Sequence, residues 1–132
     1  MAISHETIAD VLRPVIGEAQ TTVHHDQLTV TVSMSDLVDV LRELRDHPRT
    51  SFEQLLDVTA IDWLDKRSPR YEVVYFLYSI THGDRVRIKA GVPASNLHVP
   101  SVTSLWESAN WYERETYDMY GIMFDGHPDL RR

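Results

Sequence analysis

Three carboxylates near the C-terminal end of the chain are the residues best suited to chemistry. Glu113, Glu115 and Asp118 lie within six residues of one another, which suggests acid–base catalysis or a carboxylate metal site. In a helix, successive side chains point about 100° apart, so Glu113 and Glu115 diverge and only Glu115 lies near Asp118. A paired-carboxylate hydrolase needs two acids that converge. A free-standing enzyme that uses this cluster therefore remains only an alternative.

Arginines on the same part of the chain offer partners for these acids. Arg114 precedes Asp118 by four residues, which is the spacing of an ion pair along a helix. Arg131 and Arg132 follow farther along the chain. We expect a buried or interfacial ion network that includes these arginines and fixes how the residues after the helix fold back.

Metal chemistry has little basis in the sequence. His24 and His25 are adjacent, and neighbouring side chains in a strand point to opposite faces. The seven histidines form no His-x-x-x-His and no Glu-x-x-His arrangement. The chain has no cysteine, which excludes disulfides, thiolate zinc sites, cysteine nucleophiles and cysteine-ligated iron–sulfur clusters within it. We expect the histidines to be solvated or structural.

A helix is predicted to carry the acidic cluster. Ser104 stands three residues before Glu107, as in a capping box, and Gly121 can end the helix in a left-handed conformation. Helical spacing then places a carboxylate within an aromatic stripe made of Trp106, Ala109, Glu113, Tyr117 and Tyr120. Trp111 falls on a different face from Trp106, so one helix cannot bury both, and part of this surface is expected to meet another protein.

Apolar periodicity predicts the elements that position this helix. Helices are expected after Ser4 with an end at Pro14 and Gly17, after Ser35 with an end at Pro48, and briefly from Ser51 through Leu56. Strands are expected at 28–32, 58–63, 71–80 and 85–92, with 71–80 at the centre of the sheet because both of its faces are apolar. Residues 18–27 and 96–100 are expected to be connections. The order predicts one α+β domain over residues 1–132, a two-layer arrangement with a mainly antiparallel, mixed sheet of about four strands packed with helices.

Two short segments outside the acidic cluster have a predicted role. The residues from Asp125 to Pro128 are of types that favour a turn. We expect His127 to orient the segment that follows it rather than to act in catalysis. Arg85, Arg87 and Lys89 alternate along one strand and form a basic face, which is either solvated or able to receive an acidic partner.

Net charge and hydropathy exclude several classes of function. Thirteen basic and twenty acidic side chains give a formal net charge of −7, which disfavours nucleic acid and anionic lipid as partners. No run of about 18 apolar residues is present, so direct membrane insertion is not expected. Neither a secretory signal, a Walker loop nor a dinucleotide fingerprint is found.

A long, spaced pattern in the C-terminal half resembles a known family. It consists of Glu113-Arg114-Glu115, Asp118-Met119-Tyr120, His127 and Arg131, flanked by 57–63, 100–103 and 109–111. The pattern is similar to the signature of the 30 kDa subunit of the proton-pumping NADH:quinone oxidoreductases (respiratory complex I), and the resemblance runs from about Leu28 to Arg132. Related domains occur in membrane-bound hydrogenases, so the equivalent domain of such a complex is the alternative.

The resemblance implies a structural subunit of the hydrophilic arm that has no cofactor of its own. It implies packing against the large hydrogenase-like subunit of the quinone site, with iron–sulfur clusters, FMN and quinone in partner subunits and a peripheral place on the cytoplasmic side of the bacterial plasma membrane. The whole enzyme transfers electrons from NADH to quinone and pumps protons, whereas this chain alone is expected to be inert. The contact residues carried over are Glu113, Arg114, Glu115, Tyr117, Asp118, Gly121, Phe124, Gly126, His127 and Arg131.

The same resemblance suggests a shortened C-terminus. Members of the family usually continue well past the position of Arg132, so we expect that part of the partner-binding surface is missing. The apolar residues Phe124 and Leu130 are then expected to be exposed or engaged in self-association.

Overall fold

The structure is a computed structural model that describes residues 3–17, 20–24 (backbone only), 27–64 and 66–129. Its elements, in chain order, are α1 (His5–Ile16), β1 (Gln20–His24), β2 (Gln27–Val32), the 3-10 helix η1 (Met34–Asp36), α2 (Leu37–Asp46), β3 (Gln54–Asp62), β4 (Tyr71–Ser79), β5 (Asp84–Val92), β6 (His98–Pro100), α3 (Ala109–Tyr120) and β7 (Met123–Asp125).

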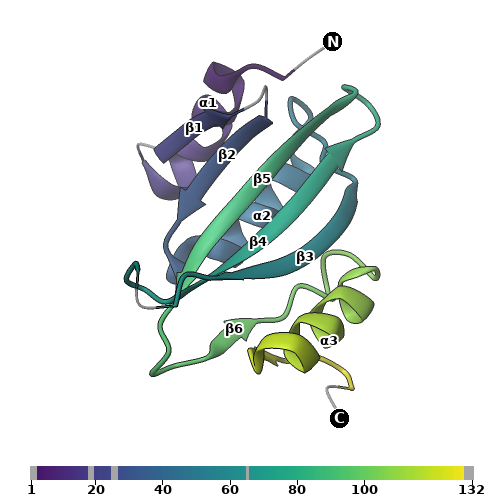
Figure 1. Cartoon of the computed structure of the whole chain (residues 1–132). Helices are drawn as coiled ribbons and strands as arrows, with labels where there is room; N and C mark the ends of the chain where they lie inside the picture. Colours follow the sequence, from purple (N-terminus) through teal and green to yellow (C-terminus); the bar gives the residue numbers. More distant parts are fainter. Residues whose placement is uncertain (1–2, 18–19, 25–26, 65, 130–132) are drawn as a thin grey trace.

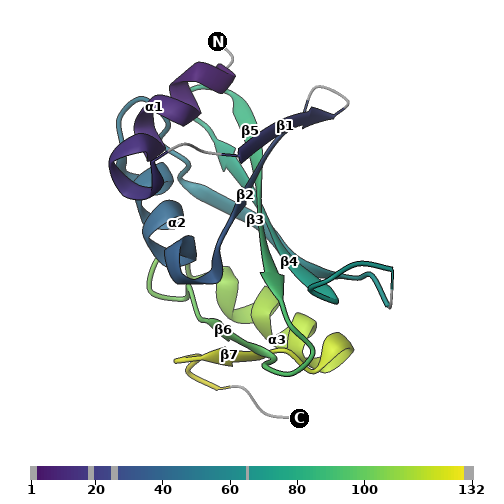
Figure 2. The same ribbon diagram turned by 90° about the vertical axis from the view of Figure 1, so that its left-hand side faces the viewer.

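A five-stranded sheet forms one layer of the described chain, in the order β1-β2-β5-β4-β3. Strand β2 runs parallel to β5, and the other three pairs are antiparallel. Helices α1 and α2 cover one face of this sheet, and the other face is open (Figures 1 and 2). The predicted two-layer α+β fold with a mixed, mainly antiparallel sheet is therefore confirmed, with one strand more than the number expected.

The core lies between the two covering helices and the inner face of the sheet. Buried and half-buried residues alternate along β5, and Leu28, Val30 and Val32 of β2 are buried at every second position, as the half-buried pattern predicts. The fully buried members of this core include Ile8, Leu12, Leu37, Leu41, Leu44, Val30, Tyr75, Leu77 and Ile88. The apolar positions in the sequence therefore determine which face of the sheet packs against the helices.

Helix α1 begins and ends where its capping residues predict, except at one proline. The Thr7 N–H donates to Ser4 Oγ at 3.1 Å, and Gly17, at φ +72°, closes the helix through its N–H to Arg13 O. Pro14 was expected to help end the helix, but it lies inside it. The helix continues because Val15 and Ile16 still pack against the core, and this burial offsets the lost hydrogen bond.

The expected short helix from Ser51 through Leu56 is wrong. Strand β3 already begins at Gln54, and Leu55 is buried opposite Leu77 of β4. The local Ser51–Gln54 capping pattern is overridden because pairing with β4 buries an apolar side chain and satisfies the backbone. Strand-like residues from Val58 onward were predicted correctly.

Three strands were missed, and the centre of the sheet was placed one strand away. Residues 20–24, expected as part of a connection, form the edge strand β1. Strands β6 and β7 form a separate parallel pair, although 96–100 was expected to be a connection. The middle strand is β5, and β4 lies between β5 and β3. Both β4 and β5 are interior strands, so an apolar pattern on both faces identifies an interior strand but not which one is central.

Helix α3 lies beside β3, at an edge of the large sheet (Figure 1). The hydroxyl of Thr116 donates to Val58 O at 2.9 Å, and that of Ser108 donates to Leu55 O at 3.1 Å. These bonds use carbonyl groups of an edge strand that would otherwise be open to another chain. The position of α3 is therefore tied to the backbone of β3 as well as to the core.

One close approach between strand and loop generates a test of the fold. A Cβ built on Gly91 would overlap with Cγ of Pro69. We expect Gly91→Ala to lower the free energy of unfolding by about 1–3 kcal/mol, because the overlap outweighs the ~0.4–1 kcal/mol gained by stiffening the unfolded chain. Urea denaturation measures this change. Thr31→Ala, at an exposed sheet position, is the control, and equal stability of Gly91→Ala and wild type would contradict the close contact.

Candidate protein-interaction site

Helix α3 begins later than predicted. The expected capping box of Ser104 and Glu107 is wrong, because residues 103–108 form turns and the helix starts at Ala109. Leu105 and Trp106 are buried, and their backbone N–H groups both donate to Val102 O, which closes a turn in place of a helix. The predicted end is confirmed: Gly121 adopts φ +73° and its N–H donates to Tyr117 O at 2.8 Å.

Glu113 is fully buried on the inner side of α3. Ser101 Oγ donates to its Oε1 and the Val102 N–H donates to its Oε2, each at 2.7 Å. Burial raises the pKa of Glu113 although both hydrogen bonds act in the opposite direction. Burial, and then the charge of Glu113, raise the pKa of the Tyr75 phenol, so this carboxyl acts electrostatically on the core of the sheet.

The part of the expected ion network that the described residues can show is absent, because Arg114 pairs there with neither Glu113 nor Asp118. Glu113 is held by a loop hydroxyl and a backbone N–H, and no arginine of the described ranges binds it. Among the described residues, Arg114 and Asp118 form no ion pair. Arg131 and Arg132 lie outside the described residues. The physical reason is that donors of the 101–102 loop already satisfy the buried carboxylate, so no arginine has to enter the core.

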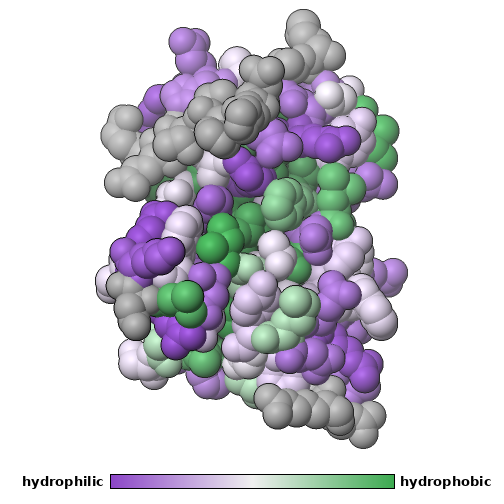
Figure 3. Space-filling model, in the orientation of Figure 1, coloured by the Kyte–Doolittle hydropathy of each residue, from purple (hydrophilic) through white to green (hydrophobic). Residues whose placement is uncertain are grey.

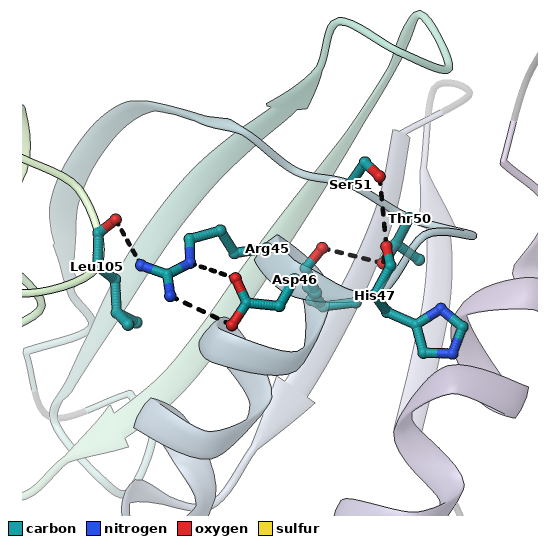
Figure 4. Close-up of polar contacts among 7 residues, drawn as sticks. Arg45, Asp46, His47, Thr50, Ser51 and Leu105 are labelled. Atoms are coloured by element: carbon teal, nitrogen blue, oxygen red, sulfur yellow. Dashed lines mark hydrogen bonds and ion pairs between the residues drawn. The ribbon is translucent and has the colours of Figure 1, made fainter.

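A second connection joins the segment before α3 to helix α2. Arg45 Nη1 donates to Leu105 O at 2.9 Å, while Nε and Nη2 of the same side chain contact the two carboxylate oxygens of Asp46 at 2.7 and 3.2 Å (Figure 4). Hydrogen bonding from Arg45 lowers the pKa of Asp46. The bidentate contact holds the guanidinium in one orientation, which positions its third nitrogen for the Leu105 carbonyl.

The residues after α3 fold back onto the start of the helix, as predicted for the 125–128 turn. His127 Nδ1 accepts from the Asp129 N–H at 3.0 Å, so Nε2 carries the proton and donates to Asn110 O at 2.9 Å. Gly126 adopts φ +89°. Phe124, expected to be exposed, is 2% exposed in β7, because the parallel pairing of β7 with β6 turns it into the core. Leu130 lies outside the described residues.

The outward side of α3 forms a surface that we call the α3 outer face. It consists of Trp111, Arg114, Glu115, Asp118 and Met119, all exposed. Trp111 is 65% exposed and Met119 is 69% exposed, and a shallow hollow of about 350 Å³ lies among Trp111, Arg114, Glu115 and Asp118. Large apolar side chains beside an arginine on a surface are typical of the residues that dominate protein interfaces.

The predicted site residues therefore divide into three groups. The exposed group is Arg114, Glu115 and Asp118; the group that holds local structure is Glu113, Gly121, Phe124, Gly126 and His127; and Tyr117 is half-buried between them. Arg131 lies outside the described residues. The contact residues implied by the family resemblance thus include three of the five residues of the α3 outer face.

Residues that the sequence analysis did not select also contribute to this region. Ser101 and Val102 supply the donors to Glu113, and no local pattern links positions eleven or twelve residues apart. The expectation that Trp106 and Trp111 cannot both be buried is confirmed, since Trp106 is buried and Trp111 exposed, but neither Trp111 nor Met119 was among the contact residues implied by the family resemblance. Their spacing from Arg114, Glu115 and Asp118 follows the helical repeat, and two large apolar residues on an otherwise charged stripe were the available signal.

Neither metal chemistry nor membrane insertion gains support from the geometry. Within the described ranges, no group of three or more His, Asp or Glu side chains is arranged to hold a metal ion. A search of those ranges also found no helix long and apolar enough to cross a bilayer.

Comparison with known proteins assigns this arrangement to a family. Residues 30–132 match the family model described as the 30 kDa subunit of respiratory-chain NADH dehydrogenase. The chain belongs to this family. The resemblance seen in the sequence is thereby confirmed.

Individual relatives agree with this assignment. An NADH-quinone oxidoreductase subunit of this family from Geobacter sulfurreducens is 48% identical over 106 residues, which cover 80% of this chain and 64% of that protein. The chain thus spans a little under two thirds of that relative's length. A trypsin-resistant fragment of Nqo5 superposes with a TM-score of 0.71 at 31% identity, covering 85% of this chain and 89% of that one. A chain of an archaeal membrane-bound sulfane sulfur reductase superposes with a TM-score of 0.78 at 26% identity, covering 96% of this chain and 72% of that one.

Removing the buried carboxyl tests its structural role. We expect Glu113→Ala to lower the free energy of unfolding by about 2–4 kcal/mol, because it leaves the buried Val102 N–H without a partner, removes one of the contacts of Ser101 Oγ and opens a cavity. Glu115→Ala, two residues away and exposed, is the matched control and should change stability by less than about 0.5 kcal/mol. Chemical denaturation of both variants decides the matter, and equal effects would contradict the assigned role of Glu113.

The raised pKa of Glu113 makes stability depend on pH in a definite direction. A carboxyl whose pKa is raised by folding stabilises the folded chain fully below its ordinary pKa of 4.5, and this contribution is lost as the pH rises through the folded-state pKa. The stability of wild type minus that of Glu113→Gln should therefore fall as the pH rises above about 4.5. Denaturation at several pH values measures this difference. A difference that is constant or rises with pH would contradict the prediction.

Proposed function

We propose that the chain is a cofactor-free structural subunit of a proton-pumping NADH:quinone oxidoreductase. It packs in the hydrophilic arm against the large hydrogenase-like subunit of the quinone site. Other subunits hold the iron–sulfur clusters, FMN and quinone, and electrons pass from NADH to quinone without entering this chain. The chain reaches the cytoplasmic side of the bacterial membrane through these subunits and inserts no segment of its own.

The proposal rests on one observation: this member of the family exposes large apolar side chains on the α3 outer face. Trp111 and Met119 expose apolar area that a lone protein gains nothing by exposing, and contact with a partner removes that area from water. Arg114, Glu115 and Asp118 surround these two residues and offer charged groups for orientation. The opposite side of the same helix is held against the rest of the fold by hydrogen bonds to β3 and to the loop before α3. The face is therefore rigid, which lowers the entropy lost on binding.

A second candidate is the equivalent subunit of a related membrane-bound complex with another electron donor or acceptor. The likeness to a chain of the archaeal sulfane sulfur reductase favours it, since that likeness extends over almost the whole chain. A membrane-bound hydrogenase-type complex belongs to the same alternative. A free-standing carboxylate enzyme has less support, because Glu113 points into the core and only Glu115 and Asp118 share the exposed hollow.

Purification of the tagged protein from the membranes of its own organism tests the proposal. The membranes are solubilised in mild detergent, and the recovered subunits are identified by mass spectrometry. Recovery of the large quinone-site subunit together with NADH-oxidising subunits is the expected result. Recovery of hydrogenase or sulfur-reductase subunits would move the assignment to the related complexes, and recovery of the chain alone at good yield would contradict the subunit role.

Removal of the apolar residues of the α3 outer face should weaken this association. We expect the Trp111→Ala/Met119→Ala variant to bind the large subunit at least about 30-fold more weakly, which corresponds to ~2 kcal/mol for a central interface tryptophan. Ile80→Ala removes a comparably exposed apolar side chain elsewhere and is the matched control. Unfolding temperatures of both variants should equal that of wild type. Unchanged binding by a folded Trp111→Ala/Met119→Ala variant would contradict the assignment of this face.

A further inference from the structure

The open face of the large sheet carries a second surface, distinct from the α3 outer face. Arg85, Arg87 and Lys89 point out from β5, the middle strand, on the side away from α1 and α2. We call these three residues the β5 basic row. Figure 3, which views this face, shows an apolar band across its middle with hydrophilic residues above and below. Figure 2 shows β1–β2 at one end and the β3–β4 connection at the other, both projecting on this side.

The charges of the β5 basic row are not neutralised within the described residues. No carboxylate there forms an ion pair with any of the three side chains, although the chain as a whole carries a net charge of −7. Three unpaired cations placed side by side repel one another, and an external anion relieves this repulsion. A cationic row on an acidic protein therefore points to an anionic ligand.

The two arginines are held in place before any ligand arrives. Arg85 lies over the ring of Tyr78, with 5.7 Å from its guanidinium carbon to the ring centroid, and Arg87 Nε donates to Thr29 Oγ1 at 3.1 Å. A guanidinium has five N–H donors, so these contacts leave most of them available. Because the side chains are already positioned, less entropy is lost when they bind a carboxylate.

Carboxylates limit the β5 basic row on its β4–β3 side and beyond Lys89. Asp57 of β3 is aligned with Phe76, which is itself aligned with Arg87, and Glu72 of β4 is aligned with Gly91 just beyond Lys89. Glu72 already accepts a hydrogen bond from Trp63 Nε1 at 2.8 Å. A broad anionic surface such as a bilayer, or a polyanion such as nucleic acid, would meet these carboxylates and the net negative charge. A single chain laid along β5 avoids them.

We propose that the β5 basic row docks an acidic segment of a neighbouring subunit in an extended conformation. Alternate side chains of a strand repeat every ~6.5–7 Å, so carboxylates at alternate positions of an extended segment match the spacing of the row. A hollow of about 50 Å³, with apolar walls from Leu56 and Phe76, lies beside Arg85 and Arg87 and takes one apolar side chain of the segment. The inference rests on the proposed function, because the segment is taken to belong to the same complex.

A peptide titration tests the ligand chemistry without the complex. An octapeptide of alternating Glu and Thr is added to the ¹⁵N-labelled chain, and amide shifts are recorded by NMR. We expect saturable shifts confined to β5 and its neighbours β2 and β4, with affinity that falls as salt rises from about 0.05 to 0.3 M. An alternating Lys–Thr peptide should not bind, and a Glu–Thr peptide with all its acids in one block should bind more weakly. Shifts elsewhere, none at all, or equal binding of the block peptide would overturn the proposal.

Charge-removing variants give the matched comparison. Changing the three residues of the β5 basic row to glutamine should lower the affinity for the Glu–Thr peptide about tenfold. The control changes Arg13, Arg42 and Arg49, exposed arginines on or just after α1 and α2, to glutamine and lowers the charge equally. This control should stay within about twofold of wild type. Tighter binding of twelve-residue oligo-dT or of phosphatidylglycerol vesicles at β5 would overturn the polypeptide assignment.

Purification from membranes separates this inference from the subunit role. If the tagged wild-type chain recovers no other subunit, the proposed function fails, while the peptide titration still decides the ligand of the row. If wild type recovers its partners, the β5 glutamine variant should lose at least one of them on a wash at about 0.3 M salt that wild type withstands. Retention of every partner by a folded β5 variant would overturn the docking of a neighbouring subunit here.

Discussion

The buried carboxyl of Glu113 is the contact on which the C-terminal part of the structure depends. A carboxylate away from water needs hydrogen-bond donors, and Ser101 and Val102 supply them from a segment eleven or twelve residues earlier. This requirement brings the loop before α3 against the middle of the helix. The loop in turn receives the chain after the helix, because Ser101 N–H donates to Asp125 O at 2.8 Å. One buried carboxyl thereby joins β6, α3 and β7.

This inward anchoring explains why the outward side of α3 can serve another purpose. Thr116 and Glu113 bind the helix to β3 and to the loop, and Arg45 holds the segment before it to α2. Trp111 and Met119 take no part in the core, so their exposure is not compensated within the described chain. A helix that is fixed on one side and exposes two large apolar side chains among charges on the other is suited to assembly rather than to turnover, which agrees with the proposed subunit role.

The molecule thus presents two surfaces of different chemistry. The α3 outer face combines exposed apolar area with charges of both signs, whereas the β5 basic row is a narrow line of cations on the open side of the sheet. Apolar contact mainly contributes affinity, and charge mainly contributes orientation and selection of partner. Two such surfaces on one small domain would allow the contact with two subunits that the two proposals together require.

Features that depend on local periodicity and turn chemistry could be predicted from the residues alone. Alternation identified the strands at β2 and β5, and a run that is apolar on both faces identified β4. Gly121 marked the end of α3, and the absence of cysteine excluded thiolate chemistry. Strands β1, β6 and β7 and the strand conformation after Ser51 could not, because these segments are specified by the backbone they pair with in the folded chain. The partner of Glu113 is a further case. A buried charge needs donors, but which donors reach it depends on contacts distant in sequence that no local pattern records.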